Sequence, residues 1–242
     1  MVNVLATFVR EETRALRPTP HGACPDAPPT ADVQATVTVL GRLHSRWGSQ
    51  EVDLSGACLP HADLNDAHLS GADLTGADLT QASLDRADLA HADLGEADLS
   101  DAHLTEANLA DAGLTLAVLD RAELTDAVLS HAVLARAHLS RAWLDRADLS
   151  DASLMEADLT DAHLSGADLT QADLNGARLR GAELTSADLS EACLGHADLT
   201  ETDLAGADLT EAMLFQADLT GADLTGVLGW DTVRGAPPLG DP

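Results

Sequence analysis

The stretch ADLTGADLTQ at residues 72–81 decides the fold, because it contains two copies of a five-residue unit that fills most of the chain. Leucine stands at every fifth position from Leu54 to Leu224, which gives 35 consecutive repeats without an insertion. The residue two positions before each leucine is alanine in 33 of the 34 repeats that follow the first, and the exception is Thr202. Such regularity predicts a repeat architecture.

A period of five residues fits neither a straight helix nor a straight strand. On an α-helix successive leucines would rotate by about 140° around the axis, and on a strand they would alternate between faces. If each repeat contains a short extended piece, its alanine and leucine point to one side and the Asp between them points away. The last two positions are rich in turn-forming residues. The repeats therefore predict a coil with Leu and Ala inside, and stacked coils would bury one another's apolar faces.

This pattern resembles the pentapeptide-repeat proteins over residues 52–227. The resemblance implies an all-β fold, a right-handed quadrilateral β-helix with four repeats in each coil and with Leu and Ala stacked along its axis. The 35 repeats would then form nearly nine coils. At about 4.8 Å per coil the rod would be roughly 40 Å long.

The chain divides into three segments. We expect residues 1–50 to be an N-terminal helical segment that caps the first coil, residues 51–227 to be the solenoid, and residues 228–242 to be a C-terminal cap and tail. Caps are expected because an open β-solenoid exposes apolar core and unpaired backbone at its ends. Trp230 is predicted to be the structural cap on the last Leu/Ala layer, and the two prolines at 237–238 to end regular structure.

Two short α-helices are predicted before the repeats. The first pattern ends before Pro18, and Thr30 can cap the second helix. The same segment is similar to the one that precedes the repeats in actinobacterial members of the family, some of which carry membrane-spanning helices upstream. One alternative is therefore that this chain is the soluble repeat portion of a membrane-associated relative. The apolar positions are Val2, Leu5, Phe8, Val9 and Leu16 in the first helix, and Val33, Val37, Leu40 and Leu43 in the second.

Cysteine usage and hydropathy bear on the compartment. Cys24, Cys58 and Cys193 are too few and too scattered for a disulfide framework, which favours a reducing cytoplasm. No apolar run reaches the roughly 18 residues that a bilayer-spanning helix needs. We expect a soluble cytoplasmic protein from a bacterium, without membrane insertion of this chain.

The repeats offer no recognisable catalytic arrangement. The histidines at outward positions are scattered, so no pair has the geometry of a metal site, and carboxylates are abundant simply because Asp belongs to the repeat. The chain has no nucleotide-binding or nucleophile motif, and a convex rod is expected to lack a concave pocket. We therefore expect no enzyme, no catalytic residue, no cofactor and no metal.

The acidic surface allows two interpretations. The net charge of the chain is −28, and the repeats hold 34 acids and 7 arginines. In the simpler interpretation the Asp side chains are solvated and bond nearby turn amides; stacked carboxylates would repel one another, so salt and mild acid should stabilise the fold. In the other, about one net charge per 1.5 Å of rod approaches the one per about 1.7 Å of duplex DNA.

A rod with that charge density would not bind nucleic acid directly, but it can compete for a DNA-binding groove. Some pentapeptide-repeat proteins bind DNA gyrase as DNA mimics and confer resistance to drugs or toxins, so the resemblance makes gyrase, or another type II topoisomerase, an alternative partner here. Those members dimerise through a C-terminal module that is often helical. A homodimer is therefore considered, although the tail after residue 228 predicts no amphipathic helix.

A neutral belt at residues 112–147 interrupts the acidic surface. Four acids balance four arginines there, whereas the net charge is −12 over residues 52–111 and −15 over residues 148–227. One interpretation is local charge compensation with tolerated apolar substitutions. The other is a partner or self-association site centred on Trp143, since exposed Trp and Arg are enriched at interfaces. The candidate interaction residues are Leu116, Val118, Val128, Val133, Arg136, His138, Arg141, Trp143 and Arg146.

The sequence thus favours a non-enzymatic, acidic β-solenoid that serves as a rigid scaffold for an unidentified protein partner. The DNA-mimic function is the alternative, and the membrane-associated relative is the second alternative.

Overall fold

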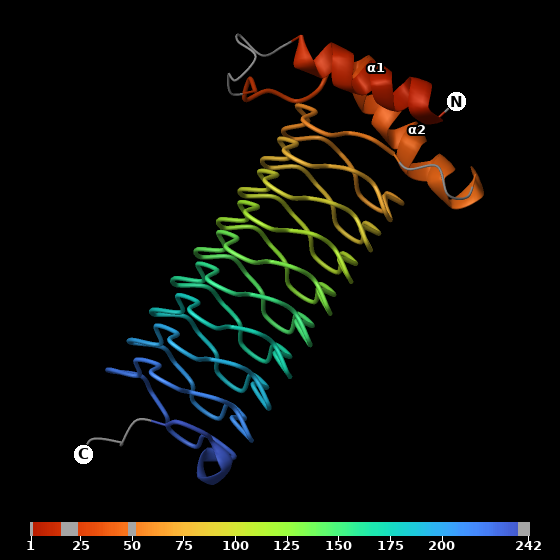
Figure 1. The fold of residues 1–242 in the computed structure, drawn as a ribbon. Helices are drawn as coiled ribbons and strands as arrows, with labels where there is room; N and C mark the ends of the chain where they lie inside the picture. Colours follow the sequence, from red (N-terminus) through yellow and green to blue (C-terminus); the bar gives the residue numbers. More distant parts are fainter. Residues whose placement is uncertain (1, 16–23, 48–51, 237–242) are drawn as a thin grey trace.

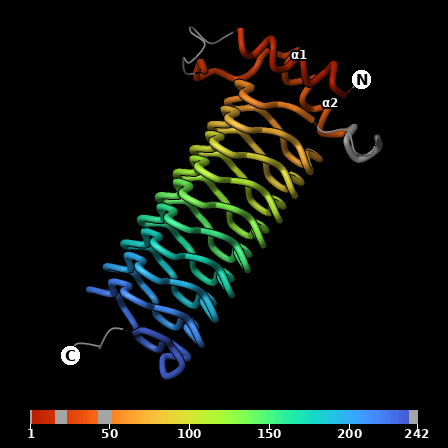
Figure 2. Tube along the Cα trace, in the orientation of Figure 1, coloured from red at the N-terminus to blue at the C-terminus, as the bar shows by residue number. Residues whose placement is uncertain are grey.

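The computed structural model describes residues 2–15, 24–47 and 52–236. Two helices, α1 (Val2–Arg14) and α2 (Ala31–Trp47), lie at one end of a straight rod that holds all the repeats, and the C-terminus lies at the other end (Figures 1 and 2). A short 3-10 helix, η1 (Trp230–Thr232), follows the last coil.

The rod is built from parallel pairs between residues twenty positions apart. Asp53 pairs with Asp73, Asp78 pairs with Asp98, and the same offset continues along the rod. Since twenty residues are four repeats, each coil has four faces and each repeat occupies one of them. In the described part of the chain the pairing consists of isolated bridges, because every repeat turns after one paired residue. The chain is therefore not all-β in the strict sense: it contains little regular strand, and the two α-helices that the sequence predicted precede the solenoid.

Each inner repeat donates three backbone bonds to its neighbouring coils, one of them from its turn residue, as Gln81 does to the Ser100 carbonyl at 2.9 Å. The Asp78 N–H donates to the Ala57 carbonyl at 2.9 Å, and the Leu79 N–H donates to the Asp98 carbonyl at 2.7 Å. The Ala82 N–H then donates to the Leu79 carbonyl at 3.0 Å, which closes the turn. The outward residue is therefore also the residue that pairs with the adjacent coils.

The turn explains which residues fill the fifth position of the repeat. The residue before each alanine has a positive φ, for example 55° at Gln81 and 60° at Leu116. Positive φ is required at the second central position of a type II turn, and Gly, Asn and Asp accept it most readily. Leu116 is therefore an unfavourable choice for the backbone.

Leucine and alanine form one continuous core along the axis. Leu79, Leu139 and their counterparts in the other inner coils are almost completely buried, as are the alanines. Thr202, the exception in the alanine series, is 1% exposed, and its hydroxyl donates to the Leu179 carbonyl at 2.9 Å. A buried hydroxyl is tolerated because this bond replaces its lost hydration.

The outward Asp side chains stabilise the turns that follow them, as the simpler interpretation predicted. Asp78 Oδ1 accepts bonds from the Thr80 amide at 3.1 Å and the Thr80 hydroxyl at 2.7 Å. Asp98 Oδ1 accepts the same pair of bonds from the amide and the hydroxyl of Ser100. These contacts explain why Thr and Ser are frequent two residues after Asp.

The two helices are amphipathic and bury one face each. Val9 in α1 and Leu40 in α2 are fully buried, whereas Phe8, which the pattern assigned to the apolar face, is 36% exposed. Its place is taken by Ala6, which the pattern missed because alanine is a weak apolar signal. The Thr30 hydroxyl accepts a bond from the Val33 amide at 3.4 Å, as predicted for a helix cap. Leu16, the Leu43 side chain and the prolines at 237–238 lie outside the described residues.

Helix α2 makes some of the hydrogen bonds that a preceding coil would make at the open edge of the solenoid. The Gln34 side-chain amide donates to the Asp63 carbonyl at 2.6 Å and accepts from the Asp63 N–H at 3.0 Å, which are the bonds that a peptide group would make. The His68 N–H donates to the Gly41 carbonyl at 2.9 Å. Gly41 has to be small, since a Cβ there would lie 2.9 Å from the Cβ of Ala67.

The other two faces of the first coil are also tied to the N-terminal segment. Arg10 forms an ion pair with Asp53. Cys24 and Cys58 form a disulfide with their Cα atoms 5.6 Å apart. The expectation that the cysteines are too scattered for disulfide bonding is therefore wrong for this pair, because their spacing in the sequence does not show that the loop before α2 returns to the first coil. Disulfides persist in oxidising compartments, so the cysteines no longer support a reducing one.

The C-terminal end is covered differently. The four residues of the last Leu/Ala layers, Leu219, Ala222, Leu224 and Val227, are partly buried, and Trp230 packs against the same core from η1. Trp230 is itself half-exposed. Its role as the structural cap stays a prediction.

Candidate protein-interaction site

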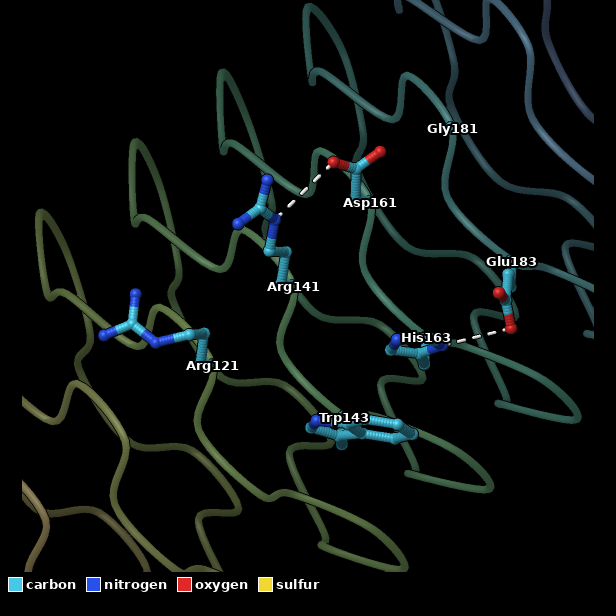
Figure 3. Close-up of a pocket in the computed structure, with 7 residues that line it drawn as sticks. All are labelled: Arg121, Arg141, Trp143, Asp161, His163, Gly181 and Glu183. Carbon is cyan, nitrogen blue, oxygen red and sulfur yellow. Dashed lines mark hydrogen bonds and ion pairs between the residues drawn. The ribbon is translucent and has the colours of Figure 1, made fainter.

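A shallow groove of about 470 Å³ lies at the C-terminal edge of the neutral belt and extends into the two coils that follow it (Figure 3). It corrects the expectation that a convex rod has no concavity. The cause is a change in side-chain size between coils: large side chains stand beside Gly181, which has none. The groove is lined by Arg121, Arg141, Trp143, Asp161, His163, Gly181 and Glu183.

Two parallel rows of residues form the groove, one on a face of the rod and one on the corner before it. Trp143, His163 and Glu183 are consecutive partners in one ladder. Arg141 and Asp161 occupy the turn positions two residues earlier. At the next turn Gly181 has a φ of +67°, and a Cβ there would lie 2.6 Å from Asp161 Oδ1. The Gly181 position therefore keeps the groove open.

The face row carries an aromatic pair. The rings of Trp143 and His163 stack with their centroids 4.0 Å apart and their planes 12° from parallel. His163 Nδ1 lies 3.0 Å from Glu183 Oε2, so the imidazole is held from both sides. Trp143 nevertheless remains 46% exposed.

The corner row carries two arginines that differ in how closely each pairs with a carboxylate. Arg121 makes two bonds to Asp101, at 2.7 and 2.6 Å, which lower the pKa of that carboxyl and raise the pKa of the guanidinium. Arg141 Nε lies 3.7 Å from Asp161 Oδ2, beyond hydrogen-bond length. Arg121 is therefore committed to its partner, whereas Arg141 and Asp161 are loosely associated.

Of the nine predicted interaction residues, the groove contains Arg141 and Trp143. Leu116 and Val133 are exposed, at 37% and 43%, but they belong to another corner and face of the rod. The other five lie around the belt: Val118 and Val128 are half-buried and His138 is exposed, while Arg136 pairs with Glu156 at 3.7 Å and Arg146 with Asp126 at 2.6 Å.

Sequence reasoning missed several residues of this surface. His163 and Glu183 lie outside the neutral belt, one and two coils after Trp143, so the charge count did not include them. Met155, which is 44% exposed on another corner of the rod, was also missed because it lies beyond residue 147, where the neutral belt ends. The twenty-residue offset would have found His163 and Glu183.

Among the described residues no group of three or more His, Cys, Asp or Glu side chains is arranged to hold a metal ion. Of the helices that the structure describes, none combines the length and the apolar character needed to cross a bilayer.

The sequence pattern of the pentapeptide-repeat family matches residues 50–85, 82–121, 122–161, 162–200 and 192–228. The chain belongs to the pentapeptide-repeat family. No curated protein matches it. The family relatives imply that the solenoid is a right-handed β-helix, and the protein is a repeat scaffold.

Among solved structures, the chain is similar to HetL, a pentapeptide-repeat protein involved in heterocyst differentiation regulation in the cyanobacterium Nostoc sp. strain PCC 7120. The two share 38% identity over 75% of this chain and 82% of HetL, with a TM-score of 0.57. The fluoroquinolone resistance protein QnrB1, in a trypsin-treated form, is 21% identical over 69% of this chain and 88% of its own, with a TM-score of 0.40. A protein from the Arabidopsis thaliana thylakoid lumen is 36% identical over 39% and 66%, with a TM-score of 0.38.

Proposed function

We propose that this protein is a non-enzymatic, rigid interaction scaffold that binds a protein partner through its neutral belt. The observation that carries the proposal is Trp143, a large aromatic side chain that stands half-exposed beside a groove on a strongly acidic rod. Such residues are enriched where proteins bind one another. The likeness to HetL, a pentapeptide-repeat protein involved in the regulation of heterocyst differentiation, supports a regulatory role.

The rod suits this role because its backbone is held in every coil by bonds to both neighbours. Interfaces on such a surface require little ordering on binding, which reduces the entropic cost of association. The belt also interrupts two strongly acidic stretches, so it differs from its surroundings in both charge and shape.

The test compares the wild type with Trp143→Asp in a pull-down from the source organism and in light scattering after size exclusion. We expect the variant to melt like the wild type, because Trp143 points outward, and to lose a partner or a self-association that the wild type shows. Trp143→Phe is the matched control and should keep the contact. An unchanged set of partners and an unchanged mass for Trp143→Asp would refute the belt as the contact surface.

The second candidate function is mimicry of DNA toward a type II topoisomerase such as gyrase. The observation in its favour is that most outward Asp carboxylates form regular ladders along the rod, at a charge density near that of duplex DNA. The neutral belt counts against it, because it divides the charge into two parts.

Variants that test mimicry should reverse surface charge without breaking the turn bonds of the solenoid. Asp198 and Asp218 accept bonds from turn residues, so reversing their charge would also weaken the fold. Glu191 and Glu211 stand at exposed turn positions and make no such turn bond. If mimicry is the function, the wild type should inhibit or protect gyrase in a supercoiling assay, and Glu191→Arg with Glu211→Arg should remove the effect. No effect of the wild type over a wide concentration range would exclude it.

A further inference from the structure

We propose that the groove beside Trp143 is a receptor for an arginine side chain that a basic segment of the partner inserts there. This proposal rests on the scaffold function above and names the chemistry of its partner. It depends on the charge of the rod, the free surface of the indole and the carboxylates that line the groove.

The charge of the rod favours a basic partner. The belt is flanked by net charges of −12 and −15, so a cationic segment is attracted along the whole rod. A uniform row of carboxylates cannot fix where such a segment stops, because every coil is equivalent. The groove breaks that equivalence and can therefore set the register of the partner.

The indole of Trp143 offers a surface on which a guanidinium can stack. His163 lies against one side of the ring. Glu123, the preceding residue in the ladder, contacts His103 of the coil before at 2.9 Å, so the carboxylate on that side of the indole already has a partner. Tryptophan is the best cation–π partner among the side chains, and arginine stacks on it through its planar group.

Two carboxylates stand beside this surface with acceptor capacity left. The nearest cationic group to Asp161 Oδ2 is Arg141 Nε at 3.7 Å, too far for a hydrogen bond. Glu183 uses Oε2 for His163, which leaves Oε1. Figure 3 shows both acids on the groove, on the side away from Arg121. Asp161 and Glu183 belong to the coils after Trp143, on the side of the indole that His163 covers, so a guanidinium can bond them with its five donors while it packs along the exposed edges of the two stacked rings.

The arginines that line the groove do not turn it into an anion site. Arg121 is already bound by both oxygens of Asp101. Arg141 is the less constrained of the two, but an anion that approached it would meet the potential of the acidic rod on both sides. An arginine of the partner can instead compete with Arg141 for Asp161.

The experiment measures the anisotropy of a labelled, blocked octapeptide that has two arginines among glycines and serines. It is titrated with the full-length protein at low and at physiological salt, beside peptides with lysine, citrulline or glutamate in place of arginine. We expect arginine to bind best, lysine more weakly, and the citrulline and glutamate peptides to show no saturable binding.

Variants then locate the binding. Trp143→Ala should weaken the arginine peptide about three- to five-fold, and Trp143→Phe about two-fold. Asp161→Asn with Glu183→Gln should weaken it about five-fold. The matched control is Asp151→Asn with Glu191→Gln, which removes the same charge from the corner two turns away and should change binding less than two-fold. Circular dichroism melts check that each variant is folded.

Three results would overturn the proposal: no binding to the wild type, binding of the citrulline or glutamate peptide as strong as that of arginine, or equal losses in the groove variants and in the control pair. In each case the scaffold function would still be decided by the pull-down with Trp143→Asp. Conversely, arginine binding at the groove together with an unchanged pull-down would refute the belt as the partner surface and leave the receptor standing.

Discussion

The two ends of the solenoid are covered in different ways. At the N-terminal end each of the four faces of the first coil meets the helical segment through a different contact: an ion pair at Asp53, a disulfide at Cys58, a side-chain amide at Asp63 and a backbone bond at His68. At the C-terminal end the core of the last layers is partly buried and Trp230 packs against it. In a repeat protein stability is a sum over neighbouring units, so the less covered end should open first.

The largest expected effect comes from placing a charge in the core, and it should differ between the centre of the rod and the C-terminal end. Leu139→Asp places a charge in a fully buried layer and should cost at least about 4 kcal/mol of unfolding free energy. Leu219→Asp makes the same change in a partly exposed layer and should cost roughly half as much, because the carboxylate can reach water. Urea unfolding measures both. Equal costs would show that the two layers are equally protected.

The disulfide provides the next contrast. Cys58→Ser removes a crosslink over 34 residues and should lower the unfolding free energy of the N-terminal end by about 3–4 kcal/mol. Reductant should have the same effect on the wild type. Cys193→Ser is the control, since Cys193 carries a free thiol, whose pKa burial raises. Thermal melts with and without reductant measure this effect. If reductant leaves the melting temperature of the wild type unchanged, the disulfide does not stabilise the N-terminal end.

Trp230 tests the opposite end. Trp230→Ala removes an indole that is partly buried against the last layers, so we expect a loss of about 2 kcal/mol. Trp143→Ala removes the same side chain from an outward position and should cost less than about 0.5 kcal/mol. Hydrogen exchange should show faster opening of the last coils in the Trp230 variant. Identical exchange in the two variants would contradict a capping role.

Protonation of a single carboxylate should have the smallest effect on stability. Acid should lower the stability of the fold, whereas repulsion between stacked carboxylates alone would predict that acid raises it. A bond from Arg86 lowers the pKa of Asp66 near the N-terminal end, and bonds from Thr220 and Thr225 lower the pKa of Asp218 and Asp223 near the other. A lowered pKa in the folded state stabilises the fold above the ordinary carboxyl range, and this contribution is lost as the pH falls below about 4.

Melting temperatures between pH 7 and pH 3 test this sign. We expect them to fall as the solution becomes more acidic, and Arg86→Gln should reduce the part of that fall that comes from Asp66. A melting temperature that rose between pH 5 and pH 3 would instead show that relief of repulsion outweighs the lost bonds.

Much of the fold could be predicted because one constraint is repeated in every unit. The spacing of Leu and Ala determines what faces inward, and the resemblance to the family supplied four repeats per coil, an offset that stacks Arg121 on Asp101 and Arg146 on Asp126. The helix positions followed from apolar periodicity, and Thr30 from its place before the second helix.

The remaining features depend on contacts that no periodicity encodes. The bond between Cys24 and Cys58 requires the path of an irregular loop, and the two bonds of Gln34 require the position of a helix against a coil. The groove was missed for a different reason: it depends on the absence of a side chain at Gly181, and pattern analysis searches for side chains that are present.

The twenty-residue offset between paired positions determines how this chain can change its length. Inserting or deleting four repeats adds or removes a whole coil and leaves every downstream residue on its original face. Losing a single repeat before Trp143 would turn the remainder of the rod by a quarter of a revolution relative to α2. If the lost repeat lay between Asp101 and Arg121, these two residues would no longer stand one above the other. The number of repeats between the N-terminal helices and the groove therefore determines the direction in which the groove faces relative to those helices.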